Sequence, residues 1–225
     1  MYPLDLLHRL RGHSISLLGR AFFCHLRLLR LAHEEFHTEL TALHQDYGVP
    51  RRVEFAVEML PEEFVLVEDS AKRGRYHDVT IFIQHQGKIV VIEKHAYSKT
   101  GIVRAPSGGA NPSESLILAA KREAREETGF DVEIDRFVLE SHVLLSCGDR
   151  PPIPWVSYVF LARVVGGQLG AKDVREISDV QLRSREELLT EIRPLMLASG
   201  LGGFKYRAKM TDAFFEELDA QGITI

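Results

Sequence analysis

The sequence has few cysteines and no strong excess of either charge. Only two cysteines, Cys24 and Cys147, occur among 225 residues, and they form neither a CxxC metal pair nor a disulfide framework. The formal net charge is −4, which excludes the strongly basic composition of a general nucleic-acid-binding protein. We therefore expect a protein of the reducing cytoplasm that has no nucleic-acid partner.

Long uncharged apolar runs are also missing. A membrane-spanning helix needs roughly 20 consecutive apolar residues, and no stretch of this chain reaches that length. The N-terminal part is apolar, but a signal peptide is not predicted because arginines interrupt it. These arginines are Arg9, Arg11, Arg20, Arg27 and Arg30. We expect no membrane span.

The N-terminal part predicts a helical extension. From Ser14 to Tyr47, apolar residues recur at three- and four-residue steps, which indicates one long amphipathic helix or two shorter ones. Gly48 and Pro50 are expected to end it. We divide the chain into an extension over residues 1–50 and a body over residues 51–225. The extension is interpreted as packing against the body or against a twofold partner, which predicts a homodimer. Its arginines leave a membrane-surface helix as the alternative.

The body alternates between strand and helix patterns. Predicted strands are Val53–Val57, Phe64–Val67, Val79–Gln84, Lys88–Glu93, Val132–Leu145 and Trp155–Val165. Predicted helices are Pro112–Thr128, Arg185–Ile192 and Tyr206–Ala220. A hairpin is expected at His85–Gly87, between two of the strands. Interleaved strands and helices predict an α/β protein with helices packed on a mixed sheet.

One stretch combines a glycine loop with a helix. Pro106–Gly109 forms the loop, where glycine lets the backbone come close to a ligand or a metal. Asn111 is the expected N-cap, Pro112 fits the first helical position, and Glu114 completes a capping box. Gly129 is expected to end the helix in the left-handed conformation.

This helix carries three carboxylates on one face. Glu123, Glu126 and Glu127 are separated by one, three and four residues, so they crowd together. Taken alone, such a cluster is usually a solvated helix face. Their mutual repulsion is relieved when a cation joins them, and oxygen ligands select magnesium, calcium or manganese over zinc. Arg122 lies beside the cluster and can hold a carboxylate through two hydrogen bonds.

The whole spacing resembles the Nudix box, the signature of a family of hydrolases. Gly108, Glu114 and the run from Arg122 to Phe130 agree with that motif at every specified position, and a looser likeness covers residues 76–192. The resemblance implies a Nudix-type α/β/α sandwich around a mixed sheet. It also implies a hydrolase that cuts the diphosphate linkage of a nucleoside diphosphate derivative.

The resemblance also implies the metal and its ligands. Glu123, Glu126 and Glu127 would bind Mg²⁺, with Mn²⁺ as a possible substitute, and Arg122 would orient these carboxylates. Gly108 and Gly109 would approach the metal or the substrate phosphate through backbone groups. A water molecule activated by the cation would then attack one phosphorus atom.

Other roles stay open at the level of the sequence. The proton acceptor is expected to be Glu126 or Glu127, with Glu176 as the candidate from a distant loop and an exposed, inert glutamate as the alternative for that position. Arg104 could bind a substrate phosphate or could be a plain surface arginine. Trp155 could stack on a base, but it begins a predicted strand, so a core or interface position is expected.

The form of the glycine loop narrows the class of substrate but does not identify the substrate. Pro106–Gly108 reads Pro-Ser-Gly, which looks closer to the Pro-Ala-Gly form of ADP-ribose and nucleotide-sugar hydrolases than to the Pro-Gly-Gly form. We expect an ADP-ribose-like or nucleotide-sugar-like substrate first and a nucleoside triphosphate second. The remaining alternative is a non-catalytic nucleotide-sensing module on the same fold.

Overall fold

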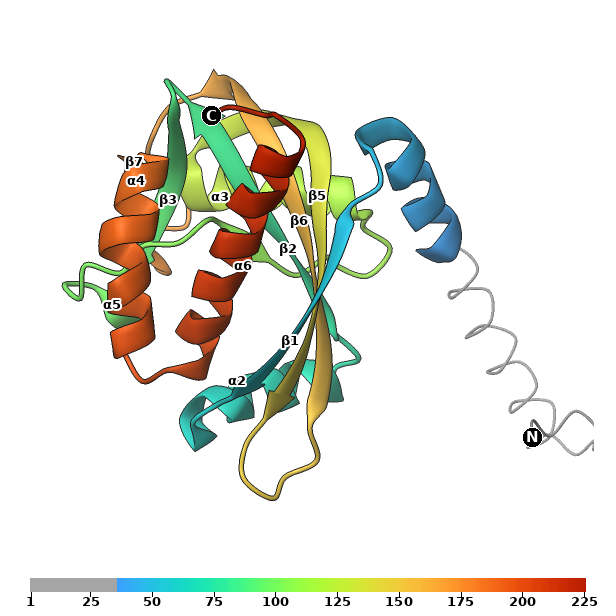
Figure 1. The fold of residues 1–225 in the computed structure, drawn as a ribbon, viewed down its shortest axis with the longest axis vertical. Helices are drawn as coiled ribbons and strands as arrows, with labels where there is room; N and C mark the ends of the chain where they lie inside the picture. Colours follow the sequence, from blue (N-terminus) through green and yellow to red (C-terminus); the bar gives the residue numbers. More distant parts are fainter. Residues whose placement is uncertain (1–35) are drawn as a thin grey trace, which may run out of the picture. The chain divides into compact units, whose positions relative to one another are not determined.

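The computed structural model describes residues 36–225, and it divides the chain into residues 1–42 and 43–225 (Figure 1). Residues 36–47 form a helix that ends before Gly48, as the sequence predicts, and Gly48 has a φ of 89°. Most of the expected Ser14–Tyr47 helix lies outside the described residues, so its role in packing, dimerisation or membrane binding stays a prediction. In residues 36–225 no helix is long and apolar enough to cross a membrane.

A seven-stranded mixed sheet forms the centre of residues 43–225. Its order is β1-β5-β6-β2-β3-β7, and β4 pairs with β2. The strands are β1 (Arg51–Glu58), β2 (His77–His85), β3 (Lys88–Lys94), β4 (Ser107–Gly108), β5 (Phe130–Ser146), β6 (Ile153–Gly167) and β7 (Ile177–Arg183). β1 runs parallel to β5 and β2 parallel to β6, whereas the other pairs are antiparallel. The predicted mixed sheet is confirmed.

Helices cover both faces of this sheet. In Figure 1, α3 (Leu116–Thr128) lies behind the sheet, and α6 (Gly202–Ala220) lies in front of it together with α4 (Arg185–Glu187) and α5 (Arg193–Ala198). A short π-helix over Leu188–Ile192 joins α4 to α5. Every residue of β2 from Val79 to Ile83 is buried, as expected for a strand covered on both faces. The α/β/α sandwich is confirmed.

Among the differences from the sequence prediction, those at α2 and β7 have a clear local cause. The expected strand Phe64–Val67 is part of helix α2 (Pro61–Lys72). Helix-start signals outweigh the strand preference of the β-branched residues here. Pro61 occupies the first turn, the first turn is acidic, and Glu63 accepts the backbone N–H of Leu60 at 3.2 Å. Strand β7 was not predicted, because its sequence is largely polar and its residues are only partly buried.

The box helix begins later than predicted. α3 starts at Leu116 with Ser115 as its N-cap, which accepts the N–H of Leu118 at 3.3 Å. The predicted N-cap Asn111 and first helical residue Pro112 therefore lie outside the helix. Glu114 accepts the N–H of Asn111 at 2.8 Å in a separate turn, because its carboxylate is held there by Arg122. The predicted end is confirmed, since Gly129 has a φ of 78°.

Gly129 offers a test of how this helix end is fixed. A Cβ at Gly129 would lie 2.2 Å from the carbonyl oxygen of Gly170, whereas a Cβ at Gly222, with a φ of 67°, meets nothing within 4 Å. We expect Gly222→Ala to cost about 1 kcal/mol of unfolding free energy, from backbone strain alone. Gly129→Ala is expected to cost about 3 kcal/mol, because the loop must also move. Equal losses in urea denaturation would contradict the packed loop.

Candidate active site

The glycine loop brings the backbone against the carboxylates of α3. Gly108 pairs with Val79 of β2, and a Cβ on Gly108 would lie 2.1 Å from the Glu123 carboxylate carbon. A Cβ on Gly109 would similarly lie 2.3 Å from Nη1 of Arg75. Both glycines are therefore needed for these close approaches, and their expected contact with the metal or the substrate phosphate stays a prediction.

Arg122 binds three of the surrounding carboxylates. Its Nε and Nη2 donate to the two oxygens of Glu114 at 2.8 and 2.9 Å. Its Nη1 donates to Glu123 at 2.8 Å and to Glu126 at 3.0 Å, and its Nη2 also reaches the Gly109 carbonyl at 2.8 Å. The hydrogen bonds to Glu114 are the largest cause that raises the pKa of Arg122. The predicted two-pronged contact is present, and it is made to Glu114.

Glu123 is a largely buried carboxylate of the site, with a side chain that is 14% exposed. Burial is the main cause that raises its pKa, and the neighbouring charges of Glu127 and Glu126 raise it further, against the lowering effect of Arg122. A buried acid surrounded by like charges is stabilised in its ionised form by any added cation. The position of Glu123 therefore suits a cation ligand.

Glu127 is held from three sides. Its side chain is 4% exposed, and its Oε2 accepts the backbone N–H of Ser107 at 2.8 Å. Its Oε1 lies 3.0 Å from Nζ of Lys94, at the end of β3, and Lys94 also forms an ion pair with Glu176. Lys94 therefore joins the distant glutamate expected from the sequence to the box, because Glu176 lies directly before β7, the neighbour of β3.

Arg104 lies inside the site rather than on the surface. Its side chain is 10% exposed, and its Nη2 lies 3.7 Å from Glu127. Its Nη1 donates to the Ala105 carbonyl and to the Ser107 hydroxyl, both at 2.8 Å. The alternative of a plain surface arginine is wrong, and the expected contact with a substrate phosphate stays a prediction. Trp155 is partly buried against the core, in agreement with the expected core position.

Sequence reasoning missed several basic residues of this site. Lys94 directly follows a predicted strand, and Arg207 lies within a predicted helix, but nothing in the local pattern of either marks a functional side chain. Arg75 packs on Gly109, its guanidinium carbon lies 5.8 Å from the Trp155 ring centroid, and its Nε is buried without a hydrogen-bond partner. These residues reach the box only through the tertiary fold.

The carboxylates offer the right donor type for a divalent metal ion. Glu123 and Glu127 are largely buried, Glu126 is 49% exposed, and all supply the oxygen donors that hard cations prefer. Within residues 36–225 no group of three or more His, Cys, Asp or Glu side chains is already arranged to hold a metal ion. Arg122 contacts Glu123 and Glu126 instead, and Lys94 contacts Glu127. The donor chemistry fits a divalent cation, because Arg122 contacts only one oxygen of Glu123 and one of Glu126 and leaves the second oxygen of each free.

Comparison with known proteins agrees with the site. The sequence profile of the NUDIX domain matches residues 74–200, more than half of the chain. The chain therefore belongs to the Nudix family. Members of this family generally use divalent metal ions, which is consistent with the carboxylate cluster on α3.

Curated relatives share part of this domain. The human 8-oxo-dGDP phosphatase NUDT18 is 30% identical over 106 residues, which are 47% of this chain and 30% of that protein. Nudix hydrolase 8 of Arabidopsis thaliana is 42% identical over 60 residues, which are 26% of this chain and 16% of that protein. The chain thus matches less than a third of the length of either relative. A solved UDP-X diphosphatase is 15% identical, with a TM-score of 0.46 and coverage of 71% of this chain and 72% of its own.

Two arginines of α3 test the role of Arg122 in binding the three carboxylates Glu114, Glu123 and Glu126, which we call the clamp. Arg122 binds three carboxylates, whereas Arg125, on the same helix, forms an ion pair only with exposed Asp131. We expect Arg122→Met to lower the unfolding free energy by about 3 kcal/mol, because partly buried carboxylates lose their cation. Arg125→Met should cost less than about 1 kcal/mol. Similar losses for both variants in denaturant titration would contradict the clamp.

The effect of Arg122 also depends on pH. Arg122 lowers the pKa of Glu114, whose ordinary value is 4.5, and it acts in the same direction on Glu123. A lowered pKa in the folded state stabilises the fold above the unfolded value, and this stabilisation is lost as the pH falls through the folded value. The difference between the wild type and Arg122→Met is therefore expected to be complete at pH 7 and to shrink below pH 4.5.

Proposed function

We propose that this protein is a Mg²⁺-dependent diphosphatase that hydrolyses the phosphoanhydride bond of a nucleoside diphosphate derivative. The observation that carries the proposal is the complete set of box contacts, in which Gly108, Arg122 and Glu114 hold the carboxylates of α3 against the glycine loop. The ADP-ribose or nucleotide-sugar class is the first candidate because of the Pro-Ser-Gly form of the loop. We place this activity in the cytoplasm and in a homodimer.

The basic residues around the box support an anionic substrate. Both Arg122 and Arg75 lie against Gly109. Arg122 donates to the Gly109 carbonyl oxygen, and Arg75 occupies the space that a side chain at this position would need. Lys94 lies on the other side, beside Glu127. A diphosphate that enters between these groups would be met by positive charge and by the glycine backbone, the groups that bind phosphate in proteins.

The metal-binding role is proposed for Glu123, Glu126 and Glu127. A bound Mg²⁺ would neutralise charge on the phosphate oxygens and lower the pKa of a water molecule. Arg122 then orients Glu123 and Glu126, and the Ser107 amide orients Glu127. The acceptor of the proton from the attacking water is proposed to be Glu126 or Glu127, with Glu176 as the candidate from the distant loop. Glu126 and Glu176 are 49% and 53% exposed, so their side chains can turn towards a water molecule.

A second substrate class rests on a different observation. The stretch that aligns with the human 8-oxo-dGDP phosphatase is 47% of this chain. This similarity favours a free nucleoside diphosphate as the substrate, with release of its terminal phosphate. Both classes share the same bond, a phosphoanhydride next to a nucleoside. They differ in their products, since a nucleotide sugar or ADP-ribose yields two phosphate esters whereas a nucleoside diphosphate yields inorganic phosphate.

A substrate screen tests the proposed activity. The full chain with Mg²⁺ should hydrolyse at least one compound among ADP-ribose, nucleotide sugars, nucleoside diphosphates and nucleoside triphosphates, with products separated by ion-exchange chromatography. Excess EDTA should abolish turnover, and Mg²⁺ or Mn²⁺ should restore it. A folded protein that binds these nucleotides without cutting any of them would instead support a nucleotide-sensing module.

A carboxylate pair tests where the chemistry occurs. We expect Glu127→Gln to lower kcat by at least about 100-fold, because a metal-binding carboxylate is lost. Glu133→Gln removes an exposed carboxylate of β5 that pairs only with Lys121, at 3.1 Å, and it should leave kcat within about twofold. Unchanged turnover in Glu127→Gln would rule out the proposed site, even if the screen had found a substrate.

A further inference from the structure

We propose that Arg207 of α6 and the hydroxyl of Ser107 form a positioning relay that fixes Glu127, so that the C-terminal helix takes part in setting the geometry of the active site. The inference rests on the proposed function for the catalytic role of Glu127. The chain of contacts from Arg207 through Ser107 to Glu127 does not depend on that function. Neither residue touches the box carboxylates through its side chain, so both are positioning residues.

Arg207 reaches from α6 into the interior below the glycine loop. Its Nη1 donates to the Thr80 hydroxyl at 2.8 Å, and its Nη2 donates to the Ser107 hydroxyl at 2.9 Å. Its Nη2 also lies 3.3 Å from Asp78, and the side chains of Arg207 and Asp78 are 17% and 13% exposed. A guanidinium held by this many groups has one defined position.

Ser107 transmits this position to the box. Its hydroxyl accepts hydrogen bonds from Arg104 and from Arg207, at 2.8 and 2.9 Å. Its backbone N–H donates to Glu127 at 2.8 Å. The hydroxyl and the amide belong to one residue of the short strand β4, so the two guanidiniums fix the amide that holds the carboxylate. An alanine at this position, as in the Pro-Ala-Gly form of the loop, would offer no acceptor to either arginine.

The start of α6 is itself anchored, which defines where Arg207 lies. The carboxylate of Glu63 in α2 accepts the N–H groups of Gly202 and Gly203, both at 2.9 Å. The Tyr206 hydroxyl donates to the Ser141 hydroxyl of β5 at 3.0 Å. α6 begins at Gly202, beyond residues 74–200 matched by the NUDIX profile. Arg207 therefore contributes to the relay from outside the matched stretch, whereas Ser107 and Glu127 lie within it.

Hydrogen exchange at the amide of residue 107 tests the relay without any substrate or metal. We expect Ser107→Ala and Arg207→Met to lower the protection of this amide by roughly tenfold, the equivalent of one lost buried hydrogen bond. Arg207→Lys keeps the charge and should restore part of the protection. Unchanged protection in both Ser107→Ala and Arg207→Met would overturn the proposal.

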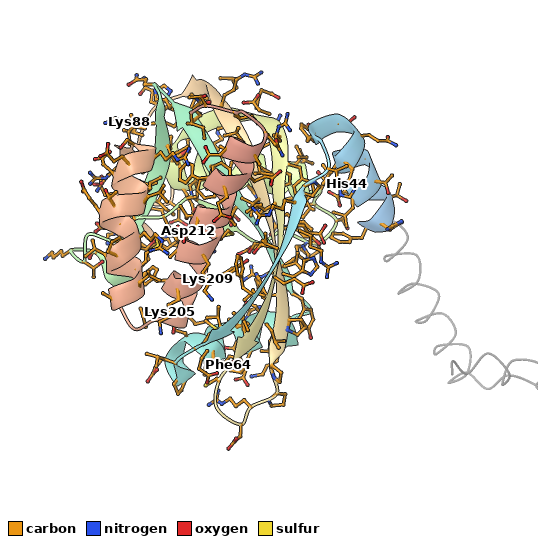
Figure 2. The ribbon with its side chains drawn as sticks, in the orientation of Figure 1. His44, Phe64, Lys88, Lys205, Lys209 and Asp212 are labelled. Atoms are coloured by element: carbon orange, nitrogen blue, oxygen red, sulfur yellow. The ribbon has the colours of Figure 1, made fainter. Side chains whose placement is uncertain are left out.

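Matched controls separate the relay from a general loss of stability. Ser141→Ala also removes a buried hydroxyl that contacts α6. Arg193→Met removes a partly buried arginine of α5 that holds Asp212 of α6 at 2.8 Å. Figure 2 labels Asp212 on α6. Both controls should destabilise the fold to a similar extent and leave the amide of residue 107 protected. Equal loss of protection in the controls would show that Arg207 acts only as a structural contact.

Kinetics tests the functional half of the proposal. With a substrate from the screen, Ser107→Ala and Arg207→Met should lower kcat about tenfold and change KM less than about twofold, because Glu127 is misplaced while substrate contacts remain. The two controls should keep kcat within about twofold. If the wild type cuts none of the substrates, the proposed function fails while the exchange experiment still decides the relay. A rise in KM alone would contradict positioning of Glu127.

Discussion

The repulsion among three carboxylates on two turns of α3 is the constraint on which the rest of the site depends. Glu127 is buried in the sandwich and Glu123 is partly buried, and charge in such places is costly without a partner. Arg122 forms an ion pair with Glu123, and Lys94 and Arg104 form ion pairs with Glu127. The same basic groups surround the place where an anionic substrate would enter, so one arrangement holds the carboxylates and favours a phosphate.

The chemistry-bearing helix could be predicted from the sequence because its information is local. Gly129, the acidic face and the flanking strands of the hairpin follow from spacing within a few residues, and the structure confirms each of them. The start of the helix was wrong for a physical reason. Glu114 accepts the Asn111 N–H as the local capping rule predicts, but Ser113 has a left-handed φ of 65°, so a helix cannot continue through it and α3 begins only after Ser115.

The rest of the site depends on contacts that no local pattern records. Glu176 lies far from the box in the sequence, and only the pairing of β3 with β7 brings it to Lys94. Arg207 reaches Ser107 because α6 is anchored on α2 and β5. The predicted strand at Phe64–Val67 failed for a related reason, since Glu63 holds the start of α6 as well as its own helix. The elements that flank the matched domain therefore supply part of its support.

The most direct test of the central claim is to locate the metal. Crystals of the full chain grown with Mn²⁺ should give an anomalous-scattering peak beside Glu123, Glu126 and Glu127, next to the contacts that Arg122 and Lys94 make with these carboxylates. The same crystals of Glu123→Gln should show a weakened peak. A well-ordered α3 with Mn²⁺ bound only elsewhere would contradict the account.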